Sequence, residues 1–390
     1  MKNKDGMFFI IYRFFSNSAL FVPIIVVFLK FKLHNSASAL SIIGAYSLAV
    51  MIFEVPTGVI ADAFGTKNTL LIGILFAVSG SLAVGFGNTY FVLLIGEILI
   101  AISVSLRSGA DSAFLFGISS SSVNVYKRLE GLSVAARYVA LCISSLAGSF
   151  LFGIDKIFPF VVSALLFGVS FFFAMLIPDI RKPHENRYGK LNLIEFGKLL
   201  KDKELLSVVL LTASVGVFFS LTYWLVQPYL QGIKMPEKFF GVIYAFSFIL
   251  SAIGAFVSGR IRFTKASNFL QVAALGVAGA FIPLSLYFVR NKFGIIFLLL
   301  NQFFIGFSYP VIFSAIQKMA TDNFRATILS AESLLQRLFL TIMIFVVSFV
   351  IKSIGIYESL LFADVILILL FVSSFTISYK SSDLFSKNKY

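Results

Sequence analysis

The chain has 390 residues, of which 59% are hydrophobic and 13% are charged, and its mean hydropathy is +0.96. A soluble domain averages about a quarter charged residues, so this composition excludes a soluble domain and predicts a chain that crosses a membrane several times. The net charge of +14 does not indicate nucleic acid binding, because most Lys and Arg residues lie at the ends of apolar runs, where they specify membrane topology.

Apolar runs separated by charged residues, Gly, Pro or Asn follow one another along the chain. A membrane-spanning helix needs about 20 mostly apolar residues, and these runs are long and continuous, unlike the short alternating strands of a membrane barrel. The sequence therefore predicts an all-α membrane protein with twelve transmembrane helices, arranged as two pseudo-symmetric six-helix bundles. The predicted spans are 7–30, 37–61, 69–87, 90–116, 131–154, 157–178, 204–230, 238–259, 267–289, 293–319, 325–351 and 355–379.

The longest polar stretch, 179–203, divides the predicted helices into two sets of six. We expect an N-terminal six-helix bundle over 1–178, a cytoplasmic linker over 179–203 and a C-terminal six-helix bundle over 204–390. In this arrangement one side of the membrane collects 20 Lys and Arg residues and the other side 8. Cytoplasmic loops carry the excess of positive charge, so both termini are predicted to be cytoplasmic, in the plasma (inner) membrane of a bacterium.

The two halves of the chain show a weak internal repeat. A shift of 197 residues places Arg128 on Arg325 and Ser133 on Ser330, and it brings the segment RLEGLS over RATILS. Duplicated halves with a binding site between them are typical of secondary transporters.

The segment GVIADAFGTK falls between the second and third predicted helices, on the predicted cytoplasmic side. It resembles the Gly-x-x-x-Asp-Arg-x-Gly-Arg-Lys loop of the major facilitator superfamily, with Ala63 and Thr66 at two usually basic positions. The matching positions are Gly58, Asp62, Gly65 and Lys67. The resemblance implies the major facilitator fold and a gate role for this loop. Asp62 would then brace the start of the 325–351 helix, whose N-terminal end attracts an acid, and Gly65 would permit a turn with positive φ.

Three further segments, EVPTGVIAD, SGADSAFLF and RATILSAESLLQRL, are most similar to bacterial drug and macrolide exporters. The predicted span 131–154 contains no proline, so it lacks the Gly-Pro signature that many proton-coupled drug exporters carry there. The resemblance also implies a layout for each group of three consecutive helices. The first would line a central cavity, the second would lie between the halves, and the third would face lipid.

Charged side chains inside the predicted spans are the main candidates for function, because an unpaired charge at mid-membrane costs at least about 2.5–3.5 kcal/mol. Arg107 and Asp111 are four residues apart and share a helix face, and Arg13 lies in the same inner half of the membrane. These three residues either contact substrate and carry coupling, or form an ion-pair network. Glu54 lies at the depth of Arg13, about 10 Å from the cytoplasmic helix end, and either pairs with Arg13 or binds a coupling proton.

Further candidates follow from their place in the predicted helices. Polar or aromatic residues expected in the cavity are Tyr223, Trp224, Gln227, Asn301 and Gln302. Candidates for structural ion pairs are Arg137, Glu332, Arg337 and Asp364. Of these, Arg337 and Asp364 both fall near mid-membrane and are expected to pair.

The sequence contains no phosphate-binding Gly-x-x-x-x-Gly-Lys-Ser/Thr loop, and no His-Glu-x-x-His motif or nucleophile elbow. We therefore expect no enzyme activity, no cofactor and no metal. The leading hypothesis is a monomeric secondary transporter that exports an amphipathic small molecule (an antibiotic, a drug or a small modified peptide) by alternating access, with a proton as coupling ion and lipid and substrate as partners. The alternatives are import of a small anionic solute, such as an organic acid, by proton symport, and a non-transporting receptor or scaffold.

Overall fold

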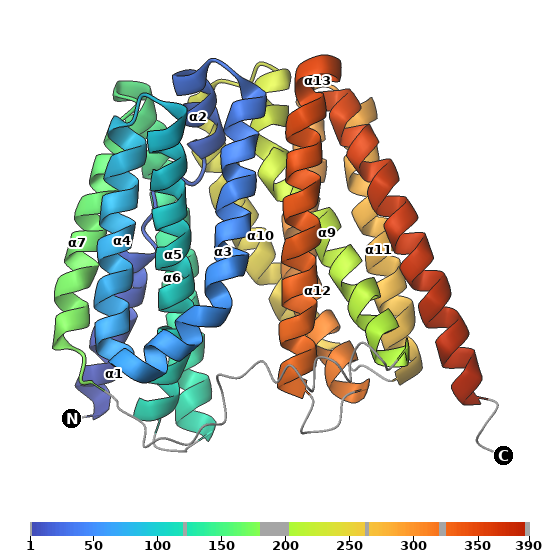
Figure 1. Ribbon diagram of the computed structural model, residues 1–390, viewed down its shortest axis with the longest axis horizontal. Coiled ribbons are helices and arrows are strands. Elements are labelled where there is room, and N and C mark those ends of the chain that lie inside the picture. Colours follow the sequence, from blue (N-terminus) through green and yellow to red (C-terminus); the bar gives the residue numbers. More distant parts are fainter. Residues whose placement is uncertain (1, 120–122, 180–202, 262–264, 320–324, 387–390) are drawn as a thin grey trace. The chain divides into compact units, whose positions relative to one another are not determined.

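The computed structural model describes residues 2–119, 123–179, 203–261, 265–319 and 325–386, and the side chains at some helix ends, including 55–64, fall outside that description. Across the described residues all regular secondary structure is helical (Figure 1), which confirms the all-α class. The helices form two compact units, Met1–Lys190 with Pro236–Phe248, and Leu191–Met235 with Ile249–Tyr390. Twelve membrane crossings and two bundles of six stay predictions.

The first unit consists of apolar helices that pack along their lengths. They are α1 (Lys2–Ser16), α2 (Ile25–Leu33), α3 (Ser36–Phe64), α4 (Thr66–Phe86), α5 (Tyr90–Ile118), α6 (Val123–Ile154) and α7 (Phe158–Leu176). Local chemistry defines several starts: Asn35 accepts hydrogen bonds from the first turn of α3, Thr89 does the same for α5, and Pro159 occupies the first turn of α7. α5 packs on α3 and α4, while α1 packs on α6 and α7.

The second unit is built around α9, which packs against α11, α12 and α13. Its elements are α9 (Lys203–Gly232), α10 (Phe240–Arg260), α11 (Lys265–Phe288), α12 (Gly294–Met319) and α13 (Arg325–Ser386). The short 3₁₀ helix η1 (Glu237–Phe239) and the start of α10 group with the first unit. Prolines lie inside α9, α11 and α12, which membrane helices tolerate when neighbouring groups satisfy the freed backbone.

The first predicted span, 7–30, is not one helix. α1 ends at Ser16, residues 17–24 form turns, and α2 begins at Ile25. The two half-helices have 15 and 9 residues, so each is shorter than a full membrane crossing. Discontinuous helices of this kind form binding sites in many transporters.

The break follows from the polar and proline residues of the segment NSALFVP. The side-chain amide of Asn17 donates to the carbonyl of Arg13 at 2.7 Å, and such local bonds compete with helix continuation. Pro23 has no backbone N–H to offer a continuing helix. Because these residues lie inside an apolar run, the hydropathy of the run does not reveal the break.

The last two predicted spans, 325–351 and 355–379, belong to the single element α13. Its backbone departs from helical geometry at Gly355, where φ is 82° and ψ is 177°, a conformation that favours glycine. We call residues 325–354 the first limb of α13 and residues 356–386 its second limb.

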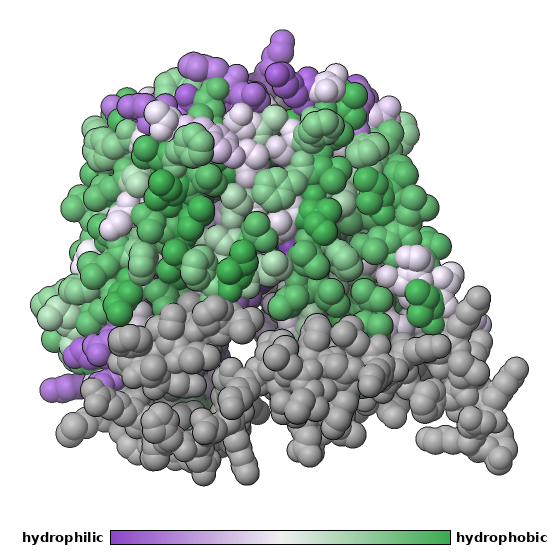
Figure 2. Space-filling view, viewed as in Figure 1, coloured by the Kyte–Doolittle hydropathy of each residue, from purple (hydrophilic) through white to green (hydrophobic). Residues whose placement is uncertain are grey.

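Ten helices in the described part of the chain are long and apolar enough to cross a membrane. Apolar side chains cover most of the coloured face in Figure 2, and hydrophilic side chains collect along its upper edge. Phe91, Phe281 and Phe349 are 72%, 58% and 84% exposed. Contiguous apolar surface of this extent is unusual in water and is expected in lipid, so the protein is a multi-pass membrane protein.

Candidate functional site

Buried polar side chains meet in the first unit where α1, α5 and α6 come together. Arg13 on α1 forms an ion pair with Asp111 on α5, from Nη1 to Oδ2. The Nε of Arg13 donates to the hydroxyl of Ser133 on α6 at 3.0 Å. The side chains of Arg13 and Asp111 are 15% and 8% exposed, so water screens their charges only weakly.

Two polar atoms beside this ion pair lack a hydrogen bond of good geometry among the described residues, although the two side chains that carry them are close enough to interact with one another. They are the hydroxyl of Tyr12 and the Oδ1 atom of Asp111, and both residues are buried. Tyr12 lies within electrostatic range of Asp111 and Arg107. Buried polar atoms are normally satisfied, so these two atoms offer a donor and acceptors that a ligand or a water can use.

Arg107 on α5 holds the C-terminal end of α1. The last carbonyls of a helix have no partner inside that helix, and the Nη1 of Arg107 donates to the carbonyl of Ser16 at 2.5 Å. Its Nε donates to the carbonyl of Ser103 at 3.4 Å. A hydrogen bond from a charged donor contributes about 1.5–3 kcal/mol, so Arg107 both stabilises the break and places a second positive charge one turn from Asp111.

Two further helices support the turns between α1 and α2. The N–H of Leu20 donates to the hydroxyl of Ser163 on α7 at 2.8 Å. Gly148 on α6 packs so closely that a Cβ there would overlap the carbonyl oxygen of Leu20. Irregular backbone at membrane depth is stable only where protein groups satisfy it, so α5, α6 and α7 together hold the break beside the ion pair.

The predicted pairing of Glu54 with Arg13 is wrong, because Arg13 bonds to Asp111 and Ser133. Glu54 is partly buried on α3, and α3 packs on α5 while α1 packs on α6 and α7. Matched depth therefore did not identify the partner. Arg137, a candidate for a structural ion pair, is exposed on α6.

The predicted gate loop is narrower than the sequence indicated. α3 continues as a helix up to Gly65, so Gly58 and Asp62 lie within it, and their side chains fall outside the described part of the chain. Gly65 alone separates α3 from α4, with φ 82° and ψ 156°. Lys67 donates to the carbonyl of Met175, at the end of α7, at 2.5 Å. The role of this segment as a gate stays a prediction.

In the second unit the predicted cavity residues lie on α9 and α12. Three of them carry buried amides: Gln227, Asn301 and Gln302. The amide of Asn301 donates to the carbonyl of Phe219 on α9 at 3.1 Å, which joins the two helices. Tyr223 and Trp224 are partly buried, and their rings meet edge to face with centroids 5.6 Å apart. Their contact with a substrate stays a prediction.

The predicted ion pair between Arg337 and Asp364 is wrong. Asp364, on the second limb of α13, is 1% exposed, and neither of its carboxylate oxygens has a hydrogen-bond partner among the described residues. Arg337, on the first limb, lies within electrostatic range of Glu332. The turn at Gly355 returns the chain to similar depth, but depth does not decide in which direction each side chain points.

Sequence reasoning did not identify the neutral members of the site. Tyr12, Ser16, Ser133 and Ser163 contribute the hydroxyls and the carbonyl described above. The available signal was small polar residues within apolar runs, next to predicted intramembrane charges. Hydropathy treats a serine as nearly neutral, so this signal is weak.

The cluster has the chemistry of a recognition site. It holds the guanidinium groups of Arg13 and Arg107 and the carboxylate of Asp111, with Glu130 also within electrostatic range of Arg13, and the planar Arg fork suits carboxylates and phosphates. In the described part of the chain, no three His, Cys, Asp or Glu side chains come together as a metal site. The site can bind a polar or anionic group and can exchange one ion-pair partner for another.

The family description of the Major Facilitator Superfamily matches residues 7–339. The chain is 24% identical over 346 residues to an uncharacterised MFS-type transporter, YxaM, of Bacillus subtilis (strain 168), covering 82% of this chain and 84% of that protein. It is 23% identical over 351 residues to an uncharacterised transporter of Buchnera aphidicola subsp. Baizongia pistaciae (strain Bp), covering 85% of both.

Solved transporter structures share the fold. A mutant of the nucleoside transporter NupG superposes with a TM-score of 0.79 at 14% identity, over 96% of this chain and 99% of that chain. A POT family transporter in complex with 5-aminolevulinic acid superposes with a TM-score of 0.75 at 13% identity, over 97% and 96% of the two chains. At these identities the likeness shows the fold alone.

Proposed function

This chain belongs to the major facilitator superfamily and is a multi-pass membrane transporter, not an enzyme, and from that premise we propose that it exports an amphipathic small molecule driven by an ion gradient. The exported compound would be an antibiotic, a drug or a small modified peptide. A non-transporting receptor or scaffold is not proposed, because the family and the named relatives are transporters.

The proposed architecture has twelve crossings in two six-helix bundles. α1 with α2 makes the first crossing, and the two limbs of α13 make the last two. The other long helices then supply nine crossings, α3 to α7 and α9 to α12. Both termini would be cytoplasmic in the inner membrane, as the distribution of Lys and Arg requires, and the protein would act as a monomer.

The observation that carries the proposal is the Arg13–Asp111 ion pair beside the break in α1. Asp111 lies in the exporter-like segment SGADSAFLF, and its pairing with Arg13 brings that segment to the discontinuous helix. Buried ionisable groups in membrane helices mark substrate and ion pathways. The aromatic-rich composition of the chain, 16% Phe, Trp and Tyr, suits an amphipathic substrate.

The ion pair supplies a means of coupling. Arg13 stays charged in all states, whereas Asp111 can exchange Arg13 for another cationic partner. A substrate cation on Asp111 would release Arg13, and the C-terminal end of α1 would then be held less firmly. A ligand shifts a conformational equilibrium by the difference in its affinity for the two states, and the ion pair provides such a difference. We take the coupling ion to be a proton.

A resistance and accumulation panel tests this function. The wild type is expressed in an efflux-deficient bacterial host, and cell accumulation of amphipathic antibiotics is measured with and without a proton uncoupler. Wild type should lower accumulation of at least one compound, and Arg13→Gln, Arg107→Gln and Asp111→Asn should each abolish the effect. Lys292→Gln, at an exposed position, is the matched control. Unchanged accumulation across the panel, or full activity of all three variants, would overturn the proposal.

The second candidate function is import of a small organic anion by proton symport. The specific observation behind it is that two guanidinium groups lie in the cluster and that Arg107 bonds to backbone carbonyls and not to an acidic side chain. Purified protein in liposomes, with an inward proton gradient, would then accumulate a radiolabelled organic acid. Uptake that depends on Arg107 and on the inward proton gradient supports import, whereas outward movement of an amphipathic compound under the same inward proton gradient supports export in exchange for protons.

A further inference from the structure

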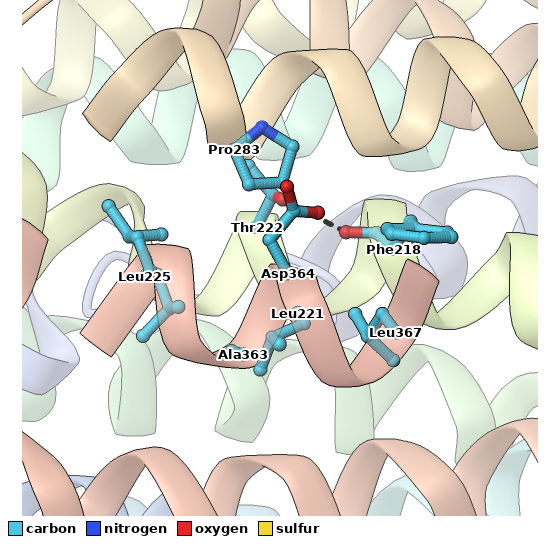
Figure 3. A pocket seen from close by; sticks show the side chains of 9 residues that line it. Phe218, Leu221, Thr222, Leu225, Pro283, Ala363, Asp364 and Leu367 are labelled. Carbon is cyan, nitrogen blue, oxygen red and sulfur yellow. Dashed lines mark hydrogen bonds between the residues drawn. The ribbon is translucent and has the colours of Figure 1, made fainter. Parts of the chain in front are cut away.

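A small pocket inside the second unit surrounds the carboxyl group of Asp364. Side chains from α9, α11 and the second limb of α13 line it, and Asp364 and Thr222 are its two polar members (Figure 3). The space open to the centre of a water molecule is about 10 Å³, which holds at most about one water. Asp364 is nine residues beyond Gly355, about 13 Å along the helix at 1.5 Å per residue.

The carboxyl group of Asp364 has no compensating charge in this pocket. α9 contributes Phe218, Thr222 and leucines, α11 contributes Pro283, and α13 contributes leucine and alanine. Among the described residues, Asp364 is the one titratable side chain that lines the pocket. Tyr223, Tyr229 and Tyr287 on α9 and α11 do not line it, and neither do Arg337 and Glu358 on α13. An isolated ionised carboxylate in such surroundings is strongly disfavoured, so a proton is the simplest ligand that makes the group compatible with its site.

A protonated Asp364 would find an acceptor in Thr222. The hydroxyl of Thr222 donates to the carbonyl of Phe218 at 2.9 Å, the interaction drawn in Figure 3. Because that bond uses the hydroxyl proton, the lone pairs of the Thr222 oxygen stay available to accept another. No hydrogen bond joins Asp364 to Thr222 as the side chains lie in the structure, so the carboxyl O–H would donate to Thr222 through one water or after a change of rotamer, and extend a chain that ends at a backbone carbonyl.

A backbone hydrogen bond of α11 is missing next to this pocket. Pro283 has no N–H, so the carbonyl of Gly279, four residues earlier, loses its helical partner. Gly279 packs on Phe218, where a Cβ would lie 2.8 Å from the Phe218 Cβ. A buried carboxyl, a hydroxyl with free lone pairs and a proline-interrupted helix thus come together in one place.

We propose that the Asp364 pocket is a reversible proton-binding site, separate from the Arg13–Asp111 cluster, in which the protonated carboxyl donates to Thr222. Its ligand is a proton and not a metal ion, because the polar side chains lining the pocket supply only one carboxylate and one hydroxyl, fewer oxygens than a hard cation takes. The inference does not depend on the substrate or the direction of transport proposed above.

Infrared difference spectroscopy of the purified protein in lipid tests the proposal directly. Spectra are recorded as the pH is cycled between acid and alkaline buffers without added substrate. We expect a carbonyl band of a buried protonated carboxyl that appears in acid and vanishes in base, and that is lost in Asp364→Asn. Thr222→Val should keep the band and change its frequency, because the carboxyl loses its hydrogen-bond acceptor. Glu97→Gln is the matched control, since Glu97 is another buried carboxyl with an unpartnered oxygen, and it should leave the Asp364 band in place.

Three results would overturn the proposal. The first is a band that persists unchanged in Asp364→Asn. The second is a wild-type spectrum with no carboxyl change, which would make Asp364 a permanently neutral structural residue. The third is a band that sodium ions remove at constant pH, which would assign the pocket to a metal cation. Asp364→Glu, which keeps a titratable group, should restore a shifted band and so guards against a misfolded Asp364→Asn variant.

Discussion

Removing the charge of Asp111 should destabilise the first unit by leaving Arg13 without a counter-charge. Asp111→Asn keeps the shape of the side chain and one oxygen acceptor, so packing changes little. Arg13 cannot lose its proton in compensation, because the guanidinium stays charged in proteins. The substitution therefore isolates the charge as the variable.

The size of the expected destabilisation by Asp111→Asn follows from the burial of the ion pair. The side chains of Arg13 and Asp111 are only 15% and 8% exposed, so solvent does not screen their interaction as it screens an exposed ion pair. Breaking a buried pair costs about 3–5 kcal/mol, and an unpaired charge in a membrane helix about 2.5–3.5 kcal/mol. Ser133 and the new amide oxygen still accept from Arg13, so we expect about 3 kcal/mol, roughly a 100-fold shift in the folded-to-unfolded ratio.

A double-mutant cycle measures this coupling. Wild type, Arg13→Gln, Asp111→Asn and the double variant are unfolded reversibly in mixed detergent micelles, and their free energies of unfolding are compared. The double variant leaves no charge unpaired, so it should be less destabilised than the two single changes together, by about 2–3 kcal/mol. Lys292→Gln, at an exposed site, should change the free energy by less than about 0.5 kcal/mol.

Additive single effects would refute the reasoning, because they would show that the two charges do not act on one another. The same cycle also separates structure from function. If the pair only holds the helices together, the stable double variant should still transport. If it carries substrate recognition or coupling, the double variant should be folded and inactive.

Three other changes test the remaining contacts of the first unit. Gly148→Ala on α6 should prevent the close approach to Leu20 and strongly lower expression and thermal stability. The control Gly153→Ala, on the same helix with open space around it, should be neutral or stabilising by up to about 1 kcal/mol. Equal thermal midpoints for the two variants would contradict this account. Arg107→Gln should lower the free energy of unfolding by about 1–3 kcal/mol, because the carbonyl of Ser16 at the end of α1 loses a charged donor. An unchanged free energy of unfolding would show that another donor satisfies this carbonyl. Glu237→Gln removes the 2.7 Å ion pair of Glu237 with Lys156. Because both side chains are more than one third exposed, the free energy of unfolding should fall by less than about 1 kcal/mol, and by less still in high salt. A larger fall that does not depend on salt would mean that the pair is shielded from water.

The family and the membrane character could be predicted from local sequence features. Continuous apolar runs identify membrane helices because lipid leaves no other way to satisfy a backbone. The shared helix face of Arg107 and Asp111 follows from their spacing of four residues, and both residues do reach the candidate site. The turn at Gly65 was also visible, since few other residues adopt positive φ easily.

The arrangement of side chains between helices could not be predicted in the same way. Depth along a helix follows from residue number, but the direction of a side chain and its partner depend on which helices pack together. Arg13 therefore has Asp111 as its partner instead of Glu54, and Asp364 lies in its own pocket instead of beside Arg337.

By itself, the sequence determined that this protein is a helical membrane transporter of the major facilitator type, because apolar length and local motifs are properties of the chain alone. Only the tertiary structure decided that α1 is broken, that Arg107, Ser163 and Gly148 support the break, and that one buried carboxyl has no partner in its pocket. The physical reason is desolvation. A polar group within the membrane is stable or costly according to the atoms that surround it, and those atoms come from helices distant in the chain.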